Sequence, residues 1–355
     1  MQILDENHMP IKIKLDNNEN PLGASPKAID SIKHAIKRIN RYPEDGCYEL
    51  KSKLSNKFNI NSDEIILGNG SYEIIQMLAK AFIQNGDNVI TPRYSFMAYK
   101  NISEQVGAKV TEIELINWQH DLEGIVNSIS NKTKLIFIAN PDNPTSCWTN
   151  SLKLRDFIEK VPNNIIIVID EAYAEYIKNV EYPNTINWIK LYPNIMVIRT
   201  FSKAYGLAGL RVGYGIASKN IINTLNKKRL KFNVNFIGLI ASIASLEDDS
   251  HINNTIKINN EGIKQLTNGF NDLNLSFFPP IGNFITVNFG KNAQIFHKKL
   301  IATGIITKSL NEYNLHDYLR ITIGLPSDNK LLLNTIEKLL RELLIEPQIP
   351  SIYFD

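Results

Sequence analysis

The chain has 355 residues, of which 43% are hydrophobic and 21% charged, as is usual for a folded globular protein. Its formal net charge of +3 and its short apolar runs argue against a nucleic-acid partner and against a membrane span. The two cysteines, Cys47 and Cys147, form no Cys-x-x-Cys motif and the first residues do not resemble a signal peptide, which together favour the cytoplasm.

Strands and helices are expected to alternate along the chain up to residue 246. Short apolar segments predict buried strands at residues 64–67, 88–91, 109–114, 135–139, 165–169, 195–200 and 212–217. Apolar residues at helical spacing predict helices at residues 26–39, 50–58, 71–83, 96–106, near 122–129, at 151–160 and, as one long helix, roughly at 220–246. This alternation predicts an α/β fold with a mostly parallel sheet covered by helices on both faces.

The pattern changes after residue 246. Strands at 284–288 and 318–323 are expected to flank a helix at 293–303, and a last helix is expected at 330–344. We therefore expect a large domain over residues 41–245 and a small α+β domain over 246–355. Residues 1–40 would form an arm and a helix that packs with the small domain, and the basic cluster at 227–231 is interpreted as a solvated face of the long helix.

Polar residues follow several of the predicted buried strands, at the edge where ligands bind in parallel sheets. Asp170 ends the apolar run Ile165–Ile169, and Tyr173 comes three residues later. Asn143 lies in a proline-rich loop after another strand, and Lys203 follows a third. Each residue alone is more often structural or solvated, but a carboxylate, a phenol, an amide and an amine at one edge form an unusual set.

One ligand would use all four groups. A pyridinium nitrogen needs a carboxylate, a ring oxygen needs hydrogen-bond donors, and an aldehyde needs a lysine amine, which together describe pyridoxal 5′-phosphate. Its phosphate would meet the strand-to-helix junction Gly68-Asn69-Gly70-Ser71, where backbone N–H groups and a helix N-terminus are expected. Thr200, Ser202 and Arg211 would add hydroxyl groups and a cation, and the aromatic ring of Tyr94 could stack on the cofactor.

Eight segments, in order along nearly the whole chain, are similar to the motifs of one enzyme family. They are DNNENPLGASP (16–26), RYPE (41–44), GNGSYE (68–73), NPDNPTS (140–146), DEAYAEY (170–176), TFSKAYGLAGLRVGY (200–214), FNVN (232–235) and YLRITIG (318–324). Through them the chain resembles the fold-type I aminotransferases that depend on pyridoxal phosphate, and most closely the histidinol-phosphate aminotransferase family. The resemblance implies a mostly parallel central sheet, a smaller α+β domain and a homodimer.

The resemblance also implies roles for individual residues. Lys203 would form the Schiff base and move a proton, Asp170 would keep the ring nitrogen protonated, and Tyr173 would bind the ring oxygen. The further cofactor-binding residues implied are Gly70, Ser71, Tyr72, Tyr94, Asn143, Thr200, Ser202, Arg211 and, from the neighbouring subunit, Tyr42. The substrate-binding residues implied are Asn20, Asn233, Lys308 and, for a carboxylate, Arg320. No metal is expected, because the six histidines are scattered without ligand spacing.

The sequence departs from the family pattern at four places. Tyr72 stands where the family usually has Asp or Asn, and Lys231 where it usually has Pro. Asp142 and Ser146 replace the Asn and Gly of the usual NPNNPTG loop. Lys308 replaces an arginine that helps to bind the substrate phosphate in the family, and a lysine can pair with phosphate only as a point charge.

The favoured function is therefore transfer of an amino group from L-histidinol phosphate to 2-oxoglutarate, in histidine biosynthesis. Three alternatives remain open: an aromatic amino acid aminotransferase, a related lyase such as a threonine-phosphate decarboxylase, and a non-catalytic protein that keeps the fold. A nicotinamide enzyme is disfavoured, because Glu73 stands where the third glycine of the dinucleotide-binding motif would be.

Overall fold

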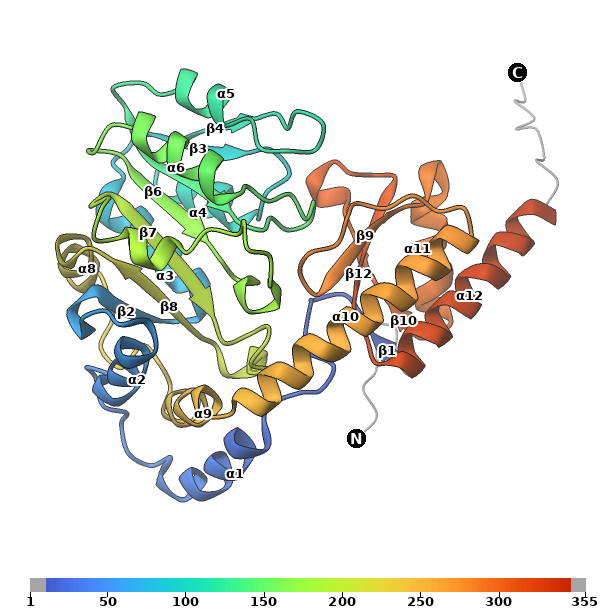
Figure 1. Cartoon of the computed structure of the whole chain (residues 1–355), viewed down its shortest axis with the longest axis horizontal. Coiled ribbons are helices and arrows are strands. Elements are labelled where there is room, and N and C mark those ends of the chain that lie inside the picture. Colours follow the sequence, from blue (N-terminus) through green and yellow to red (C-terminus); the bar gives the residue numbers. More distant parts are fainter. Residues whose placement is uncertain (1–10, 346–355) are drawn as a thin grey trace. The chain divides into compact units, whose positions relative to one another are not determined.

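The computed structural model describes residues 11–345, which fall into two compact units (Figure 1). The larger unit consists of Glu19–Asn259 and Pro279–Asn283, and the smaller one of residues 11–18, 260–278 and 284–345. Each unit has its own hydrophobic core. None of the helices formed by the described residues is both long enough and apolar enough to cross a lipid bilayer.

The larger unit is built on a seven-stranded sheet with the order β2-β8-β7-β6-β5-β3-β4. Its strands are β2 (Ile65–Asn69), β3 (Asn88–Pro92), β4 (Lys109–Ile113), β5 (Thr133–Ala139), β6 (Ile166–Asp170), β7 (Ile195–Thr200) and β8 (Val212–Ala217). β8 is antiparallel to both of its neighbours, and all other adjacent pairs are parallel. The predicted mostly parallel sheet is thus confirmed.

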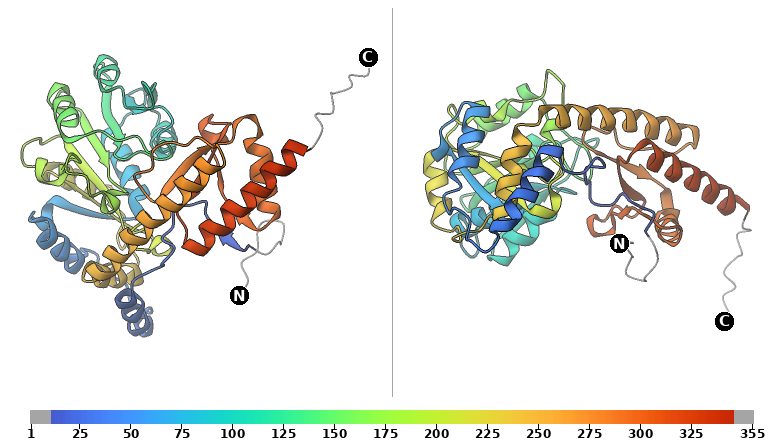
Figure 2. Two further views of the ribbon diagram at one scale, coloured as in Figure 1. Left: turned by 45° about the vertical axis from the view of Figure 1, so that its right-hand side comes forward. Right: turned by 90° about the horizontal axis from the view of Figure 1, so that it is seen from below.

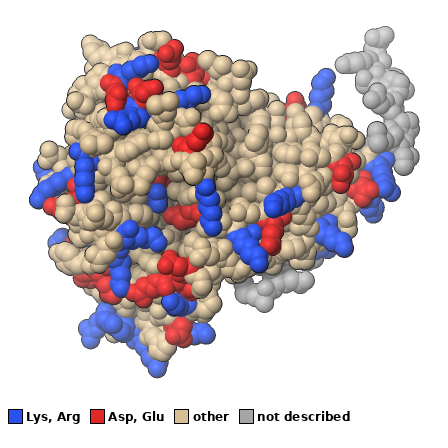
Figure 3. Space-filling model, in the orientation of Figure 1, with Lys and Arg blue, Asp and Glu red and all other residues tan. Residues whose placement is uncertain are grey.

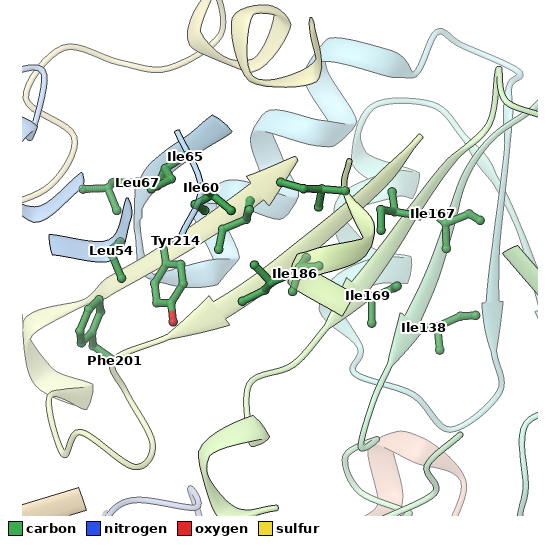
Figure 4. Packing of buried hydrophobic residues seen from close by; sticks show 14 of the residues in the cluster. Leu54, Ile60, Ile65, Leu67, Ile138, Ile167, Ile169, Ile186, Phe201 and Tyr214 are labelled. Carbon is green, nitrogen blue, oxygen red and sulfur yellow. The ribbon is translucent and has the colours of Figure 1, made fainter. Parts of the chain in front are cut away.

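The apolar strands are explained by burial of both sheet faces. Along β6, Ile167 and Ile169 belong to one hydrophobic cluster, whereas Ile166 and Val168 belong to another, because successive side chains point to opposite faces. A strand covered on both faces has no place for an alternating polar residue, so it reads as a continuous apolar run. Figure 4 shows part of the first cluster, including Ile167 and Ile169.

Helices cover both faces of this sheet (Figures 1 and 2). One face is covered by α3 (Gly70–Phe82), α4 (Ala98–Gln105) and α8 (Lys219–Asn226). The other is covered by α2 (Tyr48–Phe58), α5 (Leu122–Asn127), α6 (Ser151–Lys160), α7 (Thr185–Trp188) and α9 (Phe236–Leu246), and α1 (Pro26–Ala35) packs on α9. Short 3-10 turns occur at Ile36–Arg38, Ser62–Glu64, Ala174–Tyr176 and Ala208–Leu210.

The smaller unit contains a three-stranded antiparallel sheet with the order β11-β12-β9. Its elements are β1 (Ile13–Lys14), β9 (Phe284–Asn288), α11 (Ala293–Ala302), β10 (Ile305–Ile306), β11 (Lys308–Ser309), β12 (Tyr318–Thr322) and α12 (Pro326–Ile345), with 3-10 turns at Gly290–Asn292 and Asn311–Tyr313. β1 pairs with β10 in parallel. α10 (Asp249–Asp272) contributes residues to both units.

Three sequence predictions about the elements need correction. The expected helix over 220–246 is two helices, α8 and α9, and the basic residues 227–231 lie in the irregular segment between them. The left-handed backbone of Phe232, with φ 59°, does not fit a continuous helix. α10 was not predicted at all.

The predicted domain division also differs from the structure. α1 belongs to the larger unit, where it packs on α9, whereas residues 1–40 were expected to go with the small domain. The change of unit comes at residue 260 instead of residue 246. On the surface, both signs of charge are interspersed over the face drawn in Figure 3, consistent with the small net charge of +3.

Candidate active site

A cavity of about 170 Å³ lies at one edge of the large sheet. The carboxyl ends of β5, β6 and β7 meet at this edge, and the antiparallel β8 brings its amino end there. All of the cavity's lining residues belong to the larger unit: Ser71, Tyr72, Phe96, Tyr99, Ala139, Pro141, Asn143, Asp170, Ala172, Tyr173, Thr200, Ser202, Lys203 and Arg211.

Lys203 lies in the loop that joins β7 to β8 and lines the cavity. Its Nζ is 5.9 Å from the centre of the Tyr173 ring. The loop is held at the lysine and just after it, because Gly206 N–H donates to the Lys203 carbonyl oxygen over 2.9 Å and the Asn20 side chain donates to the Ala204 carbonyl oxygen over 2.8 Å. The amine therefore reaches the cavity from a fixed backbone.

Asp170 is the last residue of β6 and is buried. The hydroxyl of Tyr99 donates to its Oδ2 over 2.8 Å, and the backbone N–H of Ala172 donates to its Oδ1 over 3.1 Å. Burial raises the pKa of Asp170 to about 6, although these two hydrogen bonds favour the charged form. A cation bound in the cavity would lower this pKa, so the carboxylate is suited to pair with a protonated ring nitrogen.

The loop after β5 brings Pro141 and Asn143 to the cavity. Its shape is stabilised by Asp142, whose side chain is fully buried and accepts hydrogen bonds from the hydroxyls of Ser95 over 2.6 Å and Thr145 over 2.9 Å. Burial raises the pKa of Asp142 to about 7. Asp142, which replaces the usual Asn, therefore stabilises the loop that positions Asn143.

The amino end of α3 and Arg211 form an anion-binding corner. Gly70 has φ +75°, and a Cβ at this position would lie 2.4 Å from Arg211 Nη2, so only glycine allows the guanidinium to lie so close to the helix terminus. Arg211 Nη1 also donates to Ser202 Oγ over 3.3 Å. A guanidinium, hydroxyls and the first N–H groups of a helix are the groups that bind phosphate.

These residues fit pyridoxal phosphate. An amine, a carboxylate, an amide and an anion-binding corner border a single cavity, which is the donor set that an aldehyde, a ring nitrogen, a ring oxygen and a phosphate require. Of the residues predicted from the sequence to bind the cofactor, the structure brings these to the cavity: Ser71, Tyr72, Asn143, Asp170, Tyr173, Thr200, Ser202, Lys203 and Arg211.

Tyr94, the residue predicted to cover the ring, is not among the described residues that line the cavity. It has a left-handed backbone with φ 64°, and its ring packs against Trp118 at 5.9 Å. Phe96 and Tyr99 line the cavity instead. The sequence is rich in aromatic residues over positions 94–99, but it does not show which of these rings faces the cavity.

The structure does not bring Tyr42 to the cavity of its own chain either. Its side chain is 83% exposed and stacks on Phe232, with ring centres 4.8 Å apart. The two asparagines predicted near the substrate also do not line the cavity. Asn20 supports the Lys203 loop, and Asn233 donates to Glu73 Oε2 over 2.8 Å.

Lys308 and Arg320 belong to the smaller unit, where they are opposite each other on β11 and β12. Arg320 is buried and donates to the Asp16 carbonyl oxygen over 2.5 Å. Lys308 forms an ion pair with Glu312, at 2.9 Å between Nζ and Oε1. Two cations on paired strands are suited to an anionic group, and Glu312 partly neutralises one of them.

Known proteins resemble this chain along nearly its whole length. A family model described as aminotransferase class I and II matches residues 10–336. A curated relative from Pseudomonas fluorescens strain Pf-5, named histidinol-phosphate aminotransferase 2, is 40% identical over 92% of this chain and 89% of the relative. A relative from Caldicellulosiruptor saccharolyticus, named histidinol-phosphate aminotransferase, is 41% identical over 92% of each chain.

Solved structures agree with this relationship. The histidinol-phosphate aminotransferase of Sinorhizobium meliloti, solved in complex with pyridoxal-5′-phosphate, matches with a TM-score of 0.89 at 25% identity, over 94% of this chain and 92% of that one. This likeness confirms the predicted fold class. Because the family model spans most of the chain and the relatives align over 92% of it, the chain belongs to the aminotransferase class I and II family.

Proposed function

We propose that this protein is a pyridoxal phosphate-dependent aminotransferase that moves the amino group of L-histidinol phosphate to 2-oxoglutarate. The observation that carries the proposal is that Lys203, Asp170 and Arg211 border one cavity, in a chain whose relatives of that name are 40% and 41% identical. A cytoplasmic location agrees with two cysteines that are both free and buried.

Each residue of the cavity would have a separate role in binding the cofactor or in the reaction. When bound, pyridoxal phosphate supplies an aldehyde that bonds to amines and a ring that withdraws electrons. Lys203 would supply the amine that holds the aldehyde, and its Nζ would accept and return a proton of the substrate. Asp170 places a negative charge for the ring nitrogen, and Asn143 and Tyr173 offer donors to the ring oxygen. The phosphate-binding residues would be Gly70, Ser71, Tyr72, Thr200, Ser202 and Arg211.

Lys308 and Arg320 would bind the anionic end of the substrate. The two side chains come from residues directly opposite each other on paired strands, which agrees with recognition of a phosphate or a carboxylate by both. Asn20 and Asn233 would act near the substrate only through the loops that they hold. The amino acceptor 2-oxoglutarate would use the same two cations for its carboxylates.

A second candidate function is the transamination of aromatic amino acids. The observation that favours it is the Lys308–Glu312 ion pair, because a lysine whose charge is shared with a carboxylate attracts a doubly charged phosphate less than a free arginine would. A related lyase on the same cavity would release carbon dioxide and leave 2-oxoglutarate unchanged.

The functional unit would be a homodimer in which Tyr42 contacts the cofactor phosphate of the partner subunit. An exposed phenol on an exposed apolar surface is otherwise unfavourable, and this part of the larger unit carries several such side chains. They are Ile36, Ile39, Tyr42, Tyr48, Leu230 and Phe232.

The test is a panel of amino donors with 2-oxoglutarate, run on the wild type and on Lys308→Arg. We expect L-histidinol phosphate to have the highest kcat/KM in the wild type, and Lys308→Arg to raise it by roughly tenfold without a similar gain for phenylalanine or tyrosine. Lys203→Ala is the control for the cavity and should abolish turnover. A higher kcat/KM for phenylalanine or tyrosine would support the second candidate, and carbon dioxide release from L-threonine phosphate would identify a lyase.

A further inference from the structure

The hydroxyl of Tyr99 lies at the junction of the cavity and the hydrophobic core. Tyr99 is in α4, its side chain is 1% exposed, and its hydroxyl donates to Asp170 Oδ2 over 2.8 Å. Tyr99 was not predicted from the sequence as a functional residue, since nothing in the motif around Asp170 indicates which residue of another element would contact that carboxylate.

The ring of Tyr99 is held in one orientation by two other rings. It stacks on Phe137 of β5, with ring centres 4.7 Å apart and planes at 6°, and it meets the edge of Phe96 at 5.6 Å. A fully buried ring packed in this way cannot turn its hydroxyl elsewhere, because the interior is close-packed. The position of the phenol oxygen is therefore set by the core.

The two oxygens of Asp170 are bound by different donors. Oδ1 accepts from the backbone N–H of Ala172 and Oδ2 accepts from Tyr99. Each carboxylate oxygen has further acceptor capacity, so both can still accept a hydrogen bond from a ligand. The backbone just after β6 binds one oxygen, and a side chain of α4 binds the other.

The phenol acts as a permanent donor. Burial and the nearby charge of Asp170 raise the pKa of Tyr99 well above its ordinary value, so the hydroxyl keeps its proton at all relevant pH values. The other charged groups that act on Asp170 are Glu171 beside it, Lys203 after β7 and Asp142 in the loop after β5.

We propose that Tyr99 is a positioning residue for the aminotransferase reaction: its hydroxyl holds the Asp170 carboxylate in place for the ring nitrogen of the cofactor. The inference rests on the proposed function. Through its contact with Phe96, the same side chain also connects Asp170 to an aromatic ring of the cavity wall. Tyr99 thus acts on the cofactor through Asp170 and has no chemical step of its own.

The experiment compares Tyr99→Phe with the wild type, both freed of cofactor and then titrated with pyridoxal phosphate by fluorescence at several pH values. Phenylalanine keeps the ring packing and removes only the donor. A hydrogen bond to a charged group contributes enough for a roughly tenfold increase in Kd when it is lost. We also expect the pH at which affinity falls on acidification to move up by about one unit, because the carboxylate then takes up a proton more readily.

Tyr214→Phe is the matched control. Tyr214 is also a fully buried tyrosine of the larger unit, but its hydroxyl interacts with Arg199 instead of Asp170. We expect its Kd and pH profile to equal those of the wild type. A Tyr99→Phe protein with the same Kd and the same pH profile as this control would overturn the proposal.

A second background tests whether the Tyr99 hydroxyl acts through the charge of Asp170. In Asp170→Asn there is no charged acceptor, so adding Tyr99→Phe should leave the Kd for pyridoxal phosphate unchanged. A further tenfold loss in that background would mean that the Tyr99 hydroxyl acts independently of the Asp170 charge, which contradicts the proposal. The Kd of the wild type for pyridoxal phosphate tests the proposed cofactor. The ratio of the Kd of the variant to the Kd of the wild type tests the role of Tyr99.

Discussion

Phe96 and Tyr94 are neighbouring aromatic residues that differ in whether they line the cavity. Both precede α4, but only Phe96 lines the cavity, while Tyr94 packs against Trp118. The chain between β3 and α4 turns through a left-handed residue at Tyr94, and this turn determines which ring faces inward. A backbone conformation of this kind is not encoded in the motif, so the sequence did not show which ring lines the cavity.

We predict that Phe96→Ala weakens the binding of pyridoxal phosphate more than Tyr94→Ala does. Loss of a ring that packs on the cofactor should raise Kd by roughly tenfold, since an aromatic contact contributes about 1 kcal/mol beyond its buried area. Tyr94→Ala should leave Kd within about twofold, as expected for a residue outside the cavity. The measurement is the fluorescence titration of each apoprotein, and the reverse order of the two variants would show that Tyr94 covers the ring.

Asp142 is a buried acid that affects stability in a pH-dependent way. Its folded-state pKa is raised by burial to about 7, well above the value of an exposed aspartate. When the pH falls through that value, the folded protein takes up a proton that the unfolded chain does not yet bind. Linkage then requires that protonation of Asp142 increases the free energy of unfolding as the pH falls.

We predict that Asp142→Asn reduces this gain. Between about pH 8 and about pH 5, the cofactor-free wild type should gain more stability than the variant, because asparagine binds no proton. Urea unfolding at a series of pH values measures the difference. Asp156→Asn, at an exposed acid of α6, is the control and should keep the wild-type pH dependence. Equal pH dependence in Asp142→Asn and the wild type would contradict the prediction.

At the scale of elements, the loop between β7 and β8 depends on one glycine. Gly206 has φ +69°, and a Cβ there would lie 2.0 Å from the carbonyl oxygen of Gly23. The N-terminal segment and the Lys203 loop are therefore in backbone contact, and Asn20 reinforces the contact through its bond to Ala204. A side chain at position 206 has to push the two segments apart.

We predict that Gly206→Ala destabilises the protein and displaces Lys203. The strained backbone alone should cost about 1–3 kcal/mol, and the contact with Gly23 adds to it, so the melting temperature should fall by several degrees. Gly209→Ala, in the same loop, is the matched control, because a Cβ there meets nothing within 4 Å. A melting temperature for Gly206→Ala equal to that of Gly209→Ala would show that the loop adapts without cost.

The elements that the sequence predicted well are those with a single dominant signal. Every strand of the large sheet was recognised, and the central strands were recognised because burial on both faces makes them largely apolar. The prediction of one helix over 220–246 was wrong because apolar residues at helical spacing continue after the break between α8 and α9. The break is visible only in the left-handed backbone of Phe232. α10 was missed because its sequence is rich in polar residues, and its place is determined by tertiary packing.

The candidate site was predictable to a similar degree. Lys203, Asp170 and Arg211 follow or precede strands whose ends meet at one edge, so strand order alone brings them together. The side chains that support them, Tyr99 and Asp142, are buried contacts between different elements. Contacts of that kind follow from packing geometry, which a single sequence does not show.

At the scale of the whole molecule, the proposed function assigns a different task to each unit. All lining residues of the cavity belong to the larger unit, whereas Lys308 and Arg320 belong to the smaller one. In the proposed function, cofactor affinity is therefore a property of the larger unit, and discrimination between amino donors depends on residues of the smaller one.

We predict that the proposed dimer shares its active sites between subunits. Lys203→Ala and Tyr42→Ala should each have low activity, but subunits mixed and reassorted in equal amounts should regain activity. Half of the dimers would then be hybrids with one intact site, which gives about a quarter of the wild-type rate. Turnover of the mixture against each parent measures this, with sedimentation to confirm the dimer. A mixture no more active than its parents would place Tyr42 outside the partner's site.

The reversed direction of β8 has a consequence for the entropy of catalysis. Thr200 at the end of β7 is directly opposite Gly213 in β8, so the loop that carries Lys203 is closed by paired strands at both ends. The pairing restricts the lysine backbone when the sheet forms, before any substrate arrives. In the proposed function, this part of the entropy of positioning the Lys203 amine is lost on folding and not in each turnover.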